Sequence, residues 1–213
     1  MKTRALGRSG LEVSIVGLGC GALGDLALPD DAARALVHAA LDRGVTLFDS
    51  AKSYGASEDR LGRVLGPRRK DVVLATKGGY GVEGAADWTP EAVRLGIDAA
   101  LARLRTDFLD VFFFHSCPMS TLTQGDLLAE LARARDAGKI RATGYSGDGE
   151  ELAWAASRFD VVECSVNVFD RAGLAHARGV VAKRPLANAP WRFEAPPDRG
   201  DIRIYWDRMR ALA

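Results

Sequence analysis

Three apolar segments in the first half of the chain each end in a different titratable side chain. Segments 45–48, 72–76 and 109–114 lead into Asp49, Lys77 and His115, and Tyr54 follows five residues after Asp49. Short apolar segments separated by helix-like sequence are typical of parallel strands buried on both faces. Chemistry in such folds lies at the carboxyl ends of the strands. A carboxylate, an amine, an imidazole and a phenol at one rim could together transfer protons.

Each of these four residues also has a simpler interpretation when it is taken alone. Asp49 could cap a helix, Lys77 could be a solvated strand end, His115 could be a core histidine and Tyr54 could be a packed aromatic residue. The four types occur together at successive strand ends and in the loop beside one of them. This combination favours the chemical interpretation.

The composition indicates a globular domain without a polyanionic partner. The chain has 213 residues, 47% hydrophobic and 27% charged, with a formal net charge of +1. We expect one domain over residues 1–213. The scattered arginines favour neither nucleic acid nor a membrane surface as a partner, and no segment approaches the ~18 consecutive apolar residues of a membrane helix.

The cysteines and the N-terminus predict a reduced, cytoplasmic protein. Cys20, Cys117 and Cys164 are odd in number and lack the spacing of a disulfide framework. The first residues show no secretory apolar region. Cys117, two residues after His115, is either a reactive thiol at the rim or, as we favour, a small packing residue.

Strand-like and helix-like segments alternate along the chain. Besides the three strands above, strands are predicted at Val13–Gly19, Ile140–Ser146, Val161–Asn167 and Val180–Leu186. Helices are predicted from Asp30 to Gly44, Ser57–Leu65, Thr89–Leu104, Leu127–Ala137, Glu150–Arg158 and Asp201–Ala211. This order indicates an α/β protein with a parallel sheet. A doubly wound sheet is one alternative, but polar residues at the ends of successive strands favour a (β/α)8, TIM-barrel-like fold.

Three sequence segments resemble the aldo-keto reductase family. They are Phe48–Gly55 with Ser57-Glu58 and Leu61-Gly62, then Ala75-Thr76-Lys77, and then Leu104–Asp110 leading to His115. The resemblance extends from about Leu6 to Leu186. It implies a (β/α)8 barrel that reduces a small carbonyl substrate with NADPH.

The resemblance also implies a role for each of the four residues. Tyr54 would protonate the carbonyl oxygen, Lys77 would lower the pKa of Tyr54, Asp49 would pair with Lys77, and His115 would orient the carbonyl. The chemistry is reasonable by itself, because a phenol with a pKa near ~10 needs a nearby cation to exchange protons at neutral pH.

The resemblance also implies a set of residues that would bind the cofactor. At several positions near them, this chain differs from the usual family sequence. The implied residues are Gly19, Cys20, Ser146, Asn167, Lys183, Arg184, Pro185 and Leu186. The family usually has Ser-Asn where this chain has Ser146-Gly147, glutamine at Glu163 and an aromatic residue at Val166. It often has an aromatic residue, packed on the nicotinamide, where Lys183 stands here.

The predicted barrel is incomplete, with about seven strands in this sequence. The connection from Asn167 to Val180 is also short for a full helix. An open seam would leave unpaired strand edges, which favour self-association. Three explanations stay open: the sequence is part of a longer chain, the terminal helix covers the seam, or a partner subunit supplies the missing wall.

Three functions therefore compete at this stage. The first is an oxidoreductase that reduces an aldehyde or ketone with NADPH. The second is a cofactor-independent lyase, dehydratase or isomerase that uses the same residues, which the cofactor-side departures motivate. The third is a non-catalytic barrel that binds a partner.

Overall fold

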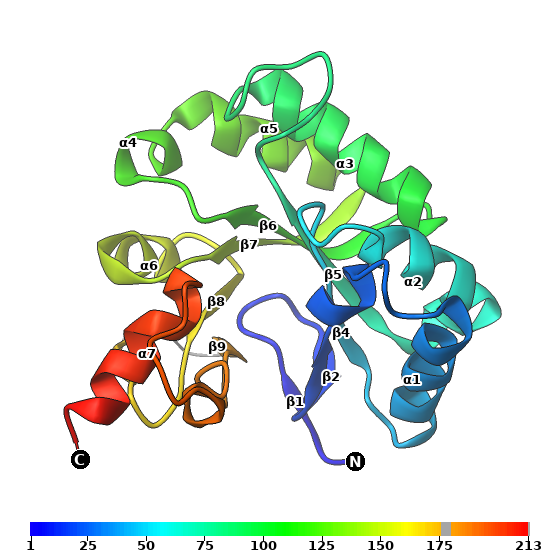
Figure 1. Ribbon diagram of the computed structural model, residues 1–213. Helices are drawn as coiled ribbons and strands as arrows, with labels where there is room; N and C mark the ends of the chain where they lie inside the picture. The colour runs from blue at the N-terminus through cyan, green and yellow to red at the C-terminus, as the bar shows by residue number, and fades with distance from the viewer. Residues whose placement is uncertain (176–179, 213) are drawn as a thin grey trace.

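Seven parallel strands form a curved sheet in the computed structural model, which describes residues 1–175 and 180–212 (Figure 1). The strands follow one another in chain order across the sheet. They are β3 (Gly17–Gly19), β4 (Leu47–Asp49), β5 (Val73–Gly78), β6 (Leu109–His115), β7 (Ile140–Ser146), β8 (Val161–Ser165) and β9 (Val180–Lys183). The predicted barrel-like α/β fold is confirmed, and it is incomplete because β3 and β9 are not paired with each other in the described residues.

Helices lie around the outside of this sheet (Figure 1). They are α1 (Asp30–Asp42), α2 (Ser57–Leu65), α3 (Pro90–Leu104), α4 (Met119–Leu122), α5 (Gly125–Asp136), α6 (Gly149–Ala156) and α7 (Gly200–Arg210). Thr89 shows why α3 begins where it does, because its hydroxyl accepts a hydrogen bond from the backbone N–H of Ala92 and Pro90 follows it. Within residues 1–175 and 180–212, no helix is long and apolar enough to cross a bilayer.

Alternate residues of each strand belong to two different cores. Val73 and Ala75 of β5 pack inside the barrel with Val111 and Phe113 of β6. Their neighbours Leu74, Phe112 and Phe114 pack outward against the helices. Because side chains alternate with a period of two, Lys77 near the end of β5 and His115 at the end of β6 fall on the inner face. The same parity places Asp49, Ser146 and Glu163 on that face.

The predicted first strand, Val13–Gly19, is divided in the structure. Its first part is β2 (Glu12–Ser14), which pairs antiparallel with β1 (Thr3–Ala5), and only β3 joins the sheet. The division occurs at Ser14, because its backbone N–H donates to the Thr46 hydroxyl and its own hydroxyl donates to the Val16 carbonyl. The hairpin supplies Leu6 and Val13 to the inner core.

The last part of the chain also differs from prediction. β8 and β9 end at Ser165 and Lys183, and Arg184 has a positive φ of 55° that ends the extended backbone. Between these strands the structure describes one short 3₁₀ helix, Ala172–Ala175, and residues 176–179 lie outside the described part.

Helix α7 packs beside the segment that follows β8. Arg208 donates hydrogen bonds to the Phe169 carbonyl and the Asp170 carboxylate, and Trp206 donates to the Phe193 carbonyl. Figure 1 shows α7 on the β8–β9 side of the molecule. These contacts do not support the explanation that the terminal helix covers the seam.

Candidate active site

Lys77 and Asp49 form a buried ion pair at the carboxyl ends of β5 and β4. The Lys77 ammonium lies 2.5 Å from Oδ1 of Asp49 and donates to the Ser50 carbonyl at 3.0 Å. Lys77 is 1% exposed. Burial alone would lower the pKa of Lys77, but the carboxylates of Glu163 and Asp49 raise it, so the ammonium stays charged.

Glu163 brings a second carboxylate to the same ammonium. Its Oε2 lies 3.4 Å from Nζ of Lys77, and its Oε1 accepts a hydrogen bond from the Ser146 hydroxyl at 2.7 Å. Oε2 is buried and has no hydrogen-bond partner among the described residues. Burial, followed by the charge of Glu163, raises the pKa of Asp49 to about 7. The two carboxylates therefore compete for one cation, and this competition makes Asp49 easier to protonate than an ordinary aspartate.

Tyr54 reaches the site from the loop between β4 and α2. Its ring centroid lies 5.3 Å from Nζ of Lys77 and 6.1 Å, edge-on, from the His115 ring. The backbone of this loop packs directly on Gly24, where an added Cβ would lie 1.6 Å from the Tyr54 carbonyl oxygen. Burial raises the pKa of Tyr54, while the charge of Lys77 acts in the opposite direction. Lys77 thus acts to lower the pKa of Tyr54, as expected from the sequence, but the opposite effect of burial is larger.

His115 is a neutral imidazole at the end of β6. Burial, together with the positive charge of Lys77, lowers its pKa to about 4. Its Nδ1 lies 3.2 Å from the Tyr80 hydroxyl, and the two rings are stacked. A neutral imidazole can donate one hydrogen bond without adding a second positive charge beside Lys77.

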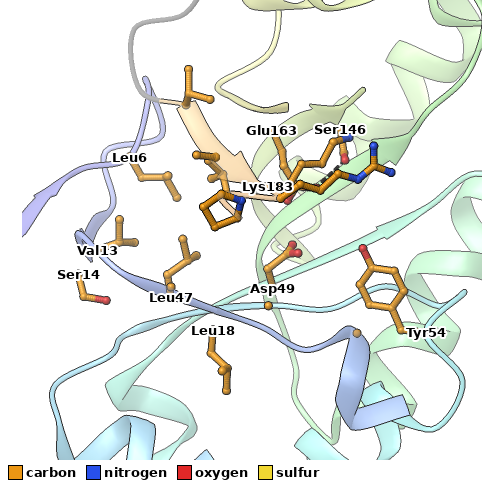
Figure 2. Close-up of a pocket in the computed structure, with 18 of the residues that line it drawn as sticks. Leu6, Val13, Ser14, Leu18, Leu47, Asp49, Tyr54, Ser146, Glu163 and Lys183 are labelled. Atoms are coloured by element: carbon orange, nitrogen blue, oxygen red, sulfur yellow. Dashed lines mark hydrogen bonds between the residues drawn. The ribbon is translucent and has the colours of Figure 1, made fainter. Parts of the chain in front are cut away.

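These groups meet at one cavity of about 930 Å³. Asp49, Tyr54, His115 and Glu163 line it, whereas Lys77 lies behind the wall. Figure 2 shows Asp49 and Tyr54 projecting toward the cavity, with Glu163, Ser146 and Lys183 across from Asp49. The cavity extends along the seam, where residues of β3, β9 and the β1–β2 hairpin line it.

The structure brings together five of the eight residues predicted for the cofactor side. Gly19, Ser146, Lys183, Arg184 and Pro185 line the cavity. Cys20 does not, because it is fully buried and its backbone N–H donates to the Asp49 carbonyl. Leu186 is 67% exposed outside the cavity.

Asn167 has a structural position instead. Its amide donates to the Arg184 carbonyl at 3.2 Å, and its Oδ1 accepts from the backbone N–H of Phe169. Cys117 is also structural, because burial raises the pKa of its thiol to about 12.

Two residues of the site were not predicted from the sequence. From the sequence, Glu163 was identified only as a difference from the usual family glutamine. Because Glu163 lies two residues after the inward-facing Val161 on β8, strand alternation could have placed it on the inner face. Tyr80 gave no sequence signal, because its contact joins the loop after β5 to the end of β6, 35 residues along the chain.

The cavity holds polar groups that suit the amide and the phosphates of a nicotinamide cofactor, the kind that the resemblance implies. Oε2 of Glu163 faces the Lys77 ammonium at 3.4 Å but makes no hydrogen bond with the described residues, so it can accept one from an amide N–H. Lys183 and Arg184 add cationic groups at the rim that suit phosphates. Among the described residues, no cluster of histidine, cysteine and carboxylate side chains has the arrangement of a metal site.

Comparisons with known proteins agree with this geometry. The sequence model of the Aldo/keto reductase family matches residues 15–179. L-galactose dehydrogenase from Arabidopsis thaliana is 36% identical over 156 residues, which are 69% of this chain and 49% of that protein. 6-Dehydroglucose reductase from Novosphingobium aromaticivorans is 36% identical over 175 residues, which are 73% of this chain and 55% of that protein. The chain thus spans about half the length of these relatives.

A solved structure shares the fold. The holo form of an aldo-keto reductase from Bacillus halodurans superposes with a TM-score of 0.78 at 26% identity. The superposition covers 94% of this chain and 72% of that one.

Proposed function

Because this chain belongs to the aldo/keto reductase family, as its sequence resemblance predicted, we propose that it reduces an aldehyde or ketone to an alcohol with NADPH. The observation that supports this proposal is the convergence of Asp49, Tyr54 and His115 on one cavity, with the buried Lys77 ammonium behind them. The named reductase and dehydrogenase relatives support oxidoreductase chemistry.

Tyr54 is the proton donor in this proposal. Its hydroxyl gives a proton to the carbonyl oxygen as that oxygen becomes an alkoxide. The phenolate that remains is stabilised by the Lys77 ammonium, whose charge is held by Asp49 and Glu163. His115 donates a hydrogen bond from its neutral ring and orients the carbonyl oxygen.

NADPH, when bound, supplies the hydride. Ser146 and Glu163 would hold its carboxamide, and Lys183 and Arg184 would face its phosphates. The usual aromatic platform is replaced by Lys183, so we expect weaker binding of the nicotinamide ring than in relatives that have the platform.

Tyr54→Phe tests the proposal most directly. We expect the variant to bind NADPH as the wild type does, by calorimetry, but to consume NADPH about 10²–10⁴-fold more slowly with a panel of aldehydes. Tyr145→Phe, which removes a phenol hydroxyl bonded to the Cys117 carbonyl, is the matched control and should keep its turnover. Undiminished turnover by Tyr54→Phe would remove Tyr54 from its assigned role.

A second candidate is a cofactor-independent lyase, dehydratase or isomerase that uses the same residues. The observation that favours it is the buried Asp49–Glu163 pair, since a carboxyl group with a pKa of about 7 can act as a general base near neutral pH. Tight NADPH binding by calorimetry would count against this candidate.

Three wider expectations from the sequence stay proposals. We propose that residues 1–213 form one domain, and that the chain works in the reducing cytoplasm, which suits its three buried free thiols. We also propose that copies associate through the unpaired edges of β3 and β9. Light scattering across a concentration series should then show a mass that rises above the monomer.

A further inference from the structure

Tyr80 is a second phenol that contacts the site from outside the cavity. It follows β5 by two residues, and its hydroxyl lies 3.2 Å from Nδ1 of His115. The two rings are stacked, with centroids 5.8 Å apart and planes inclined by 30°. Tyr80 is not among the described residues that line the cavity. It therefore contacts the imidazole rather than the space where a substrate would bind.

Close contacts within the loop after β5 hold Tyr80 next to His115. Trp88 packs so closely on Gly79 that an added Cβ would lie 2.1 Å from its indole ring. Gly79 has a φ of 122°, which favours glycine, and its carbonyl accepts a hydrogen bond from the Trp88 backbone N–H at 2.7 Å. The Trp88 ring also packs against Tyr80 at 5.8 Å.

The next residue of this loop is anchored on both sides. The backbone N–H of Gly81 donates to Oδ1 of Asp87 at 2.7 Å, and its carbonyl accepts a hydrogen bond from the Lys52 ammonium. These five contacts fix a turn in which Tyr80 has little freedom to leave His115. A tyrosine hydroxyl held in one place can determine which nitrogen of the His115 ring carries the proton.

The state in question is the tautomer of a neutral ring. His115 is uncharged at neutral pH, so one of its nitrogens carries a proton and the other a lone pair. The hydrogen bond made by one nitrogen decides which of the two is protonated. A phenol hydroxyl donates better than it accepts, because its oxygen lone pair is delocalised into the ring. Tyr80 therefore favours a lone pair on Nδ1 and a proton on Nε2.

We infer that Tyr80 is a positioning residue that fixes His115 as its Nε2–H tautomer, so that the ring offers a hydrogen-bond donor to an acceptor oxygen in the cavity. This inference rests on the proposed function only for the identity of that oxygen, a substrate carbonyl. The opposite tautomer would turn a lone pair toward the oxygen and repel it. The other groups that act on His115 are the Tyr54 ring and the charges of Lys77, Glu163 and Lys183.

The tautomer can be measured without any turnover. The chain has three histidines, so protein labelled with ¹⁵N-histidine gives few imidazole signals. The signals that disappear in His115→Asn belong to His115. We expect wild-type His115 at pH 7 to show a protonated Nε2 and an unprotonated, hydrogen-bonded Nδ1. Tyr80→Phe keeps the stacked ring but should move both signals toward those of a tautomer mixture. Tyr145→Phe, the matched loss of a phenol hydroxyl, should leave them unchanged.

Turnover provides the second measurement. We expect Tyr80→Phe to lower kcat about tenfold, the order of one lost hydrogen bond, and to change KM little. In a His115→Asn background the same substitution should have no further effect. Wild-type protein with Nδ1 protonated, or unchanged ¹⁵N signals in Tyr80→Phe, would overturn the inference. If the wild type reduces no carbonyl, the proposed function fails, while the ¹⁵N signals still decide the role of Tyr80.

Discussion

The central strands and the edge strands of the sheet differ in nearly every physical property. All six residues of β5 are buried, as are the first six of β6. No residue of β3 or β9 is fully buried, and each of these strands has an unpaired edge in the described residues. Asp49, Lys77 and His115 lie at or next to the carboxyl ends of the central strands β4–β6, whereas Lys183 ends β9 at the edge.

This difference sets how readily each region accepts a change of side chain. In the central strands, a charge must be matched by partners, because an unpaired buried charge is costly. At the edge strands, solvent and space make substitution less costly. Lys183 at the edge accordingly lies 3.8 Å from one carboxylate, that of Asp148, while the buried Lys77 faces two.

Removal of the central cation should have the largest effect. Lys77→Met leaves the Asp49 and Glu163 carboxyl groups buried without a counterion. We expect a loss of about 3–5 kcal/mol in the free energy of unfolding, measured by urea denaturation, together with loss of turnover. Lys70→Met, at an exposed position, is the control and should change stability by less than about 0.5 kcal/mol. Equal stability of the two variants would contradict the contrast between the regions.

A matched pair of glycines compares the close packing of α2 on α3, two of the helices around the sheet, with the open packing of the edge strand β3. A Cβ at Gly62 of α2 would lie 2.2 Å from the Arg103 carbonyl oxygen of α3, whereas a Cβ at Gly19 of β3 would meet nothing within 4 Å. Gly62→Ala should cost about 1–3 kcal/mol through forced separation of the two helices, although alanine is ordinarily the better helix former by roughly 0.5–1 kcal/mol.

Gly19→Ala should leave the free energy of unfolding within about 0.5 kcal/mol of the wild type. Thermal or urea denaturation of both variants provides the measurement. A tolerated Gly62→Ala would mean that α2 and α3 are not in close contact.

The smallest expected effect concerns the pH dependence of stability. The folded-state pKa of Asp49 is raised to about 7 from 3.8, so folding becomes less favourable as pH rises through this window. His115 acts in the opposite direction between about 4 and 6.5, because its pKa is lowered. Glu163→Gln removes the charge that, after burial, raises the pKa of Asp49, and it leaves the sign of the His115 contribution unchanged.

We therefore expect Glu163→Gln to gain stability relative to the wild type as pH rises from about 4 to about 7. The gain is about 1.4 kcal/mol for each unit by which the pKa of Asp49 falls. Denaturation at several pH values measures the difference, with Glu150→Gln at an exposed position as control. A difference that does not vary with pH would show that the two carboxyl groups do not interact.

Much of the fold was predictable because its signals are local. The range of β7 and that of α2 agree with prediction at both ends. Strand-like sequence marks β7, and Gly66 directly follows the last residue of α2. The β1–β2 hairpin was missed because its hydrogen bonds to Thr46 come from a distant part of the chain. The end of β9 was overextended because a positive φ at Arg184 is not encoded by a glycine. The end of β8 was overextended because Asn167 pairs with Asp170 in a turn.

The amino-acid sequence by itself determined which chemical groups reach the inner rim, because strand parity and parallel order place Asp49, Lys77 and His115 there. The tertiary structure alone decided how these groups are partnered. It placed Glu163 beside Lys77 and Tyr80 on His115, and it left Asn167 outside the cavity. The physical reason is that such contacts depend on strand register and loop path, which arise only when segments far apart in the sequence pack together.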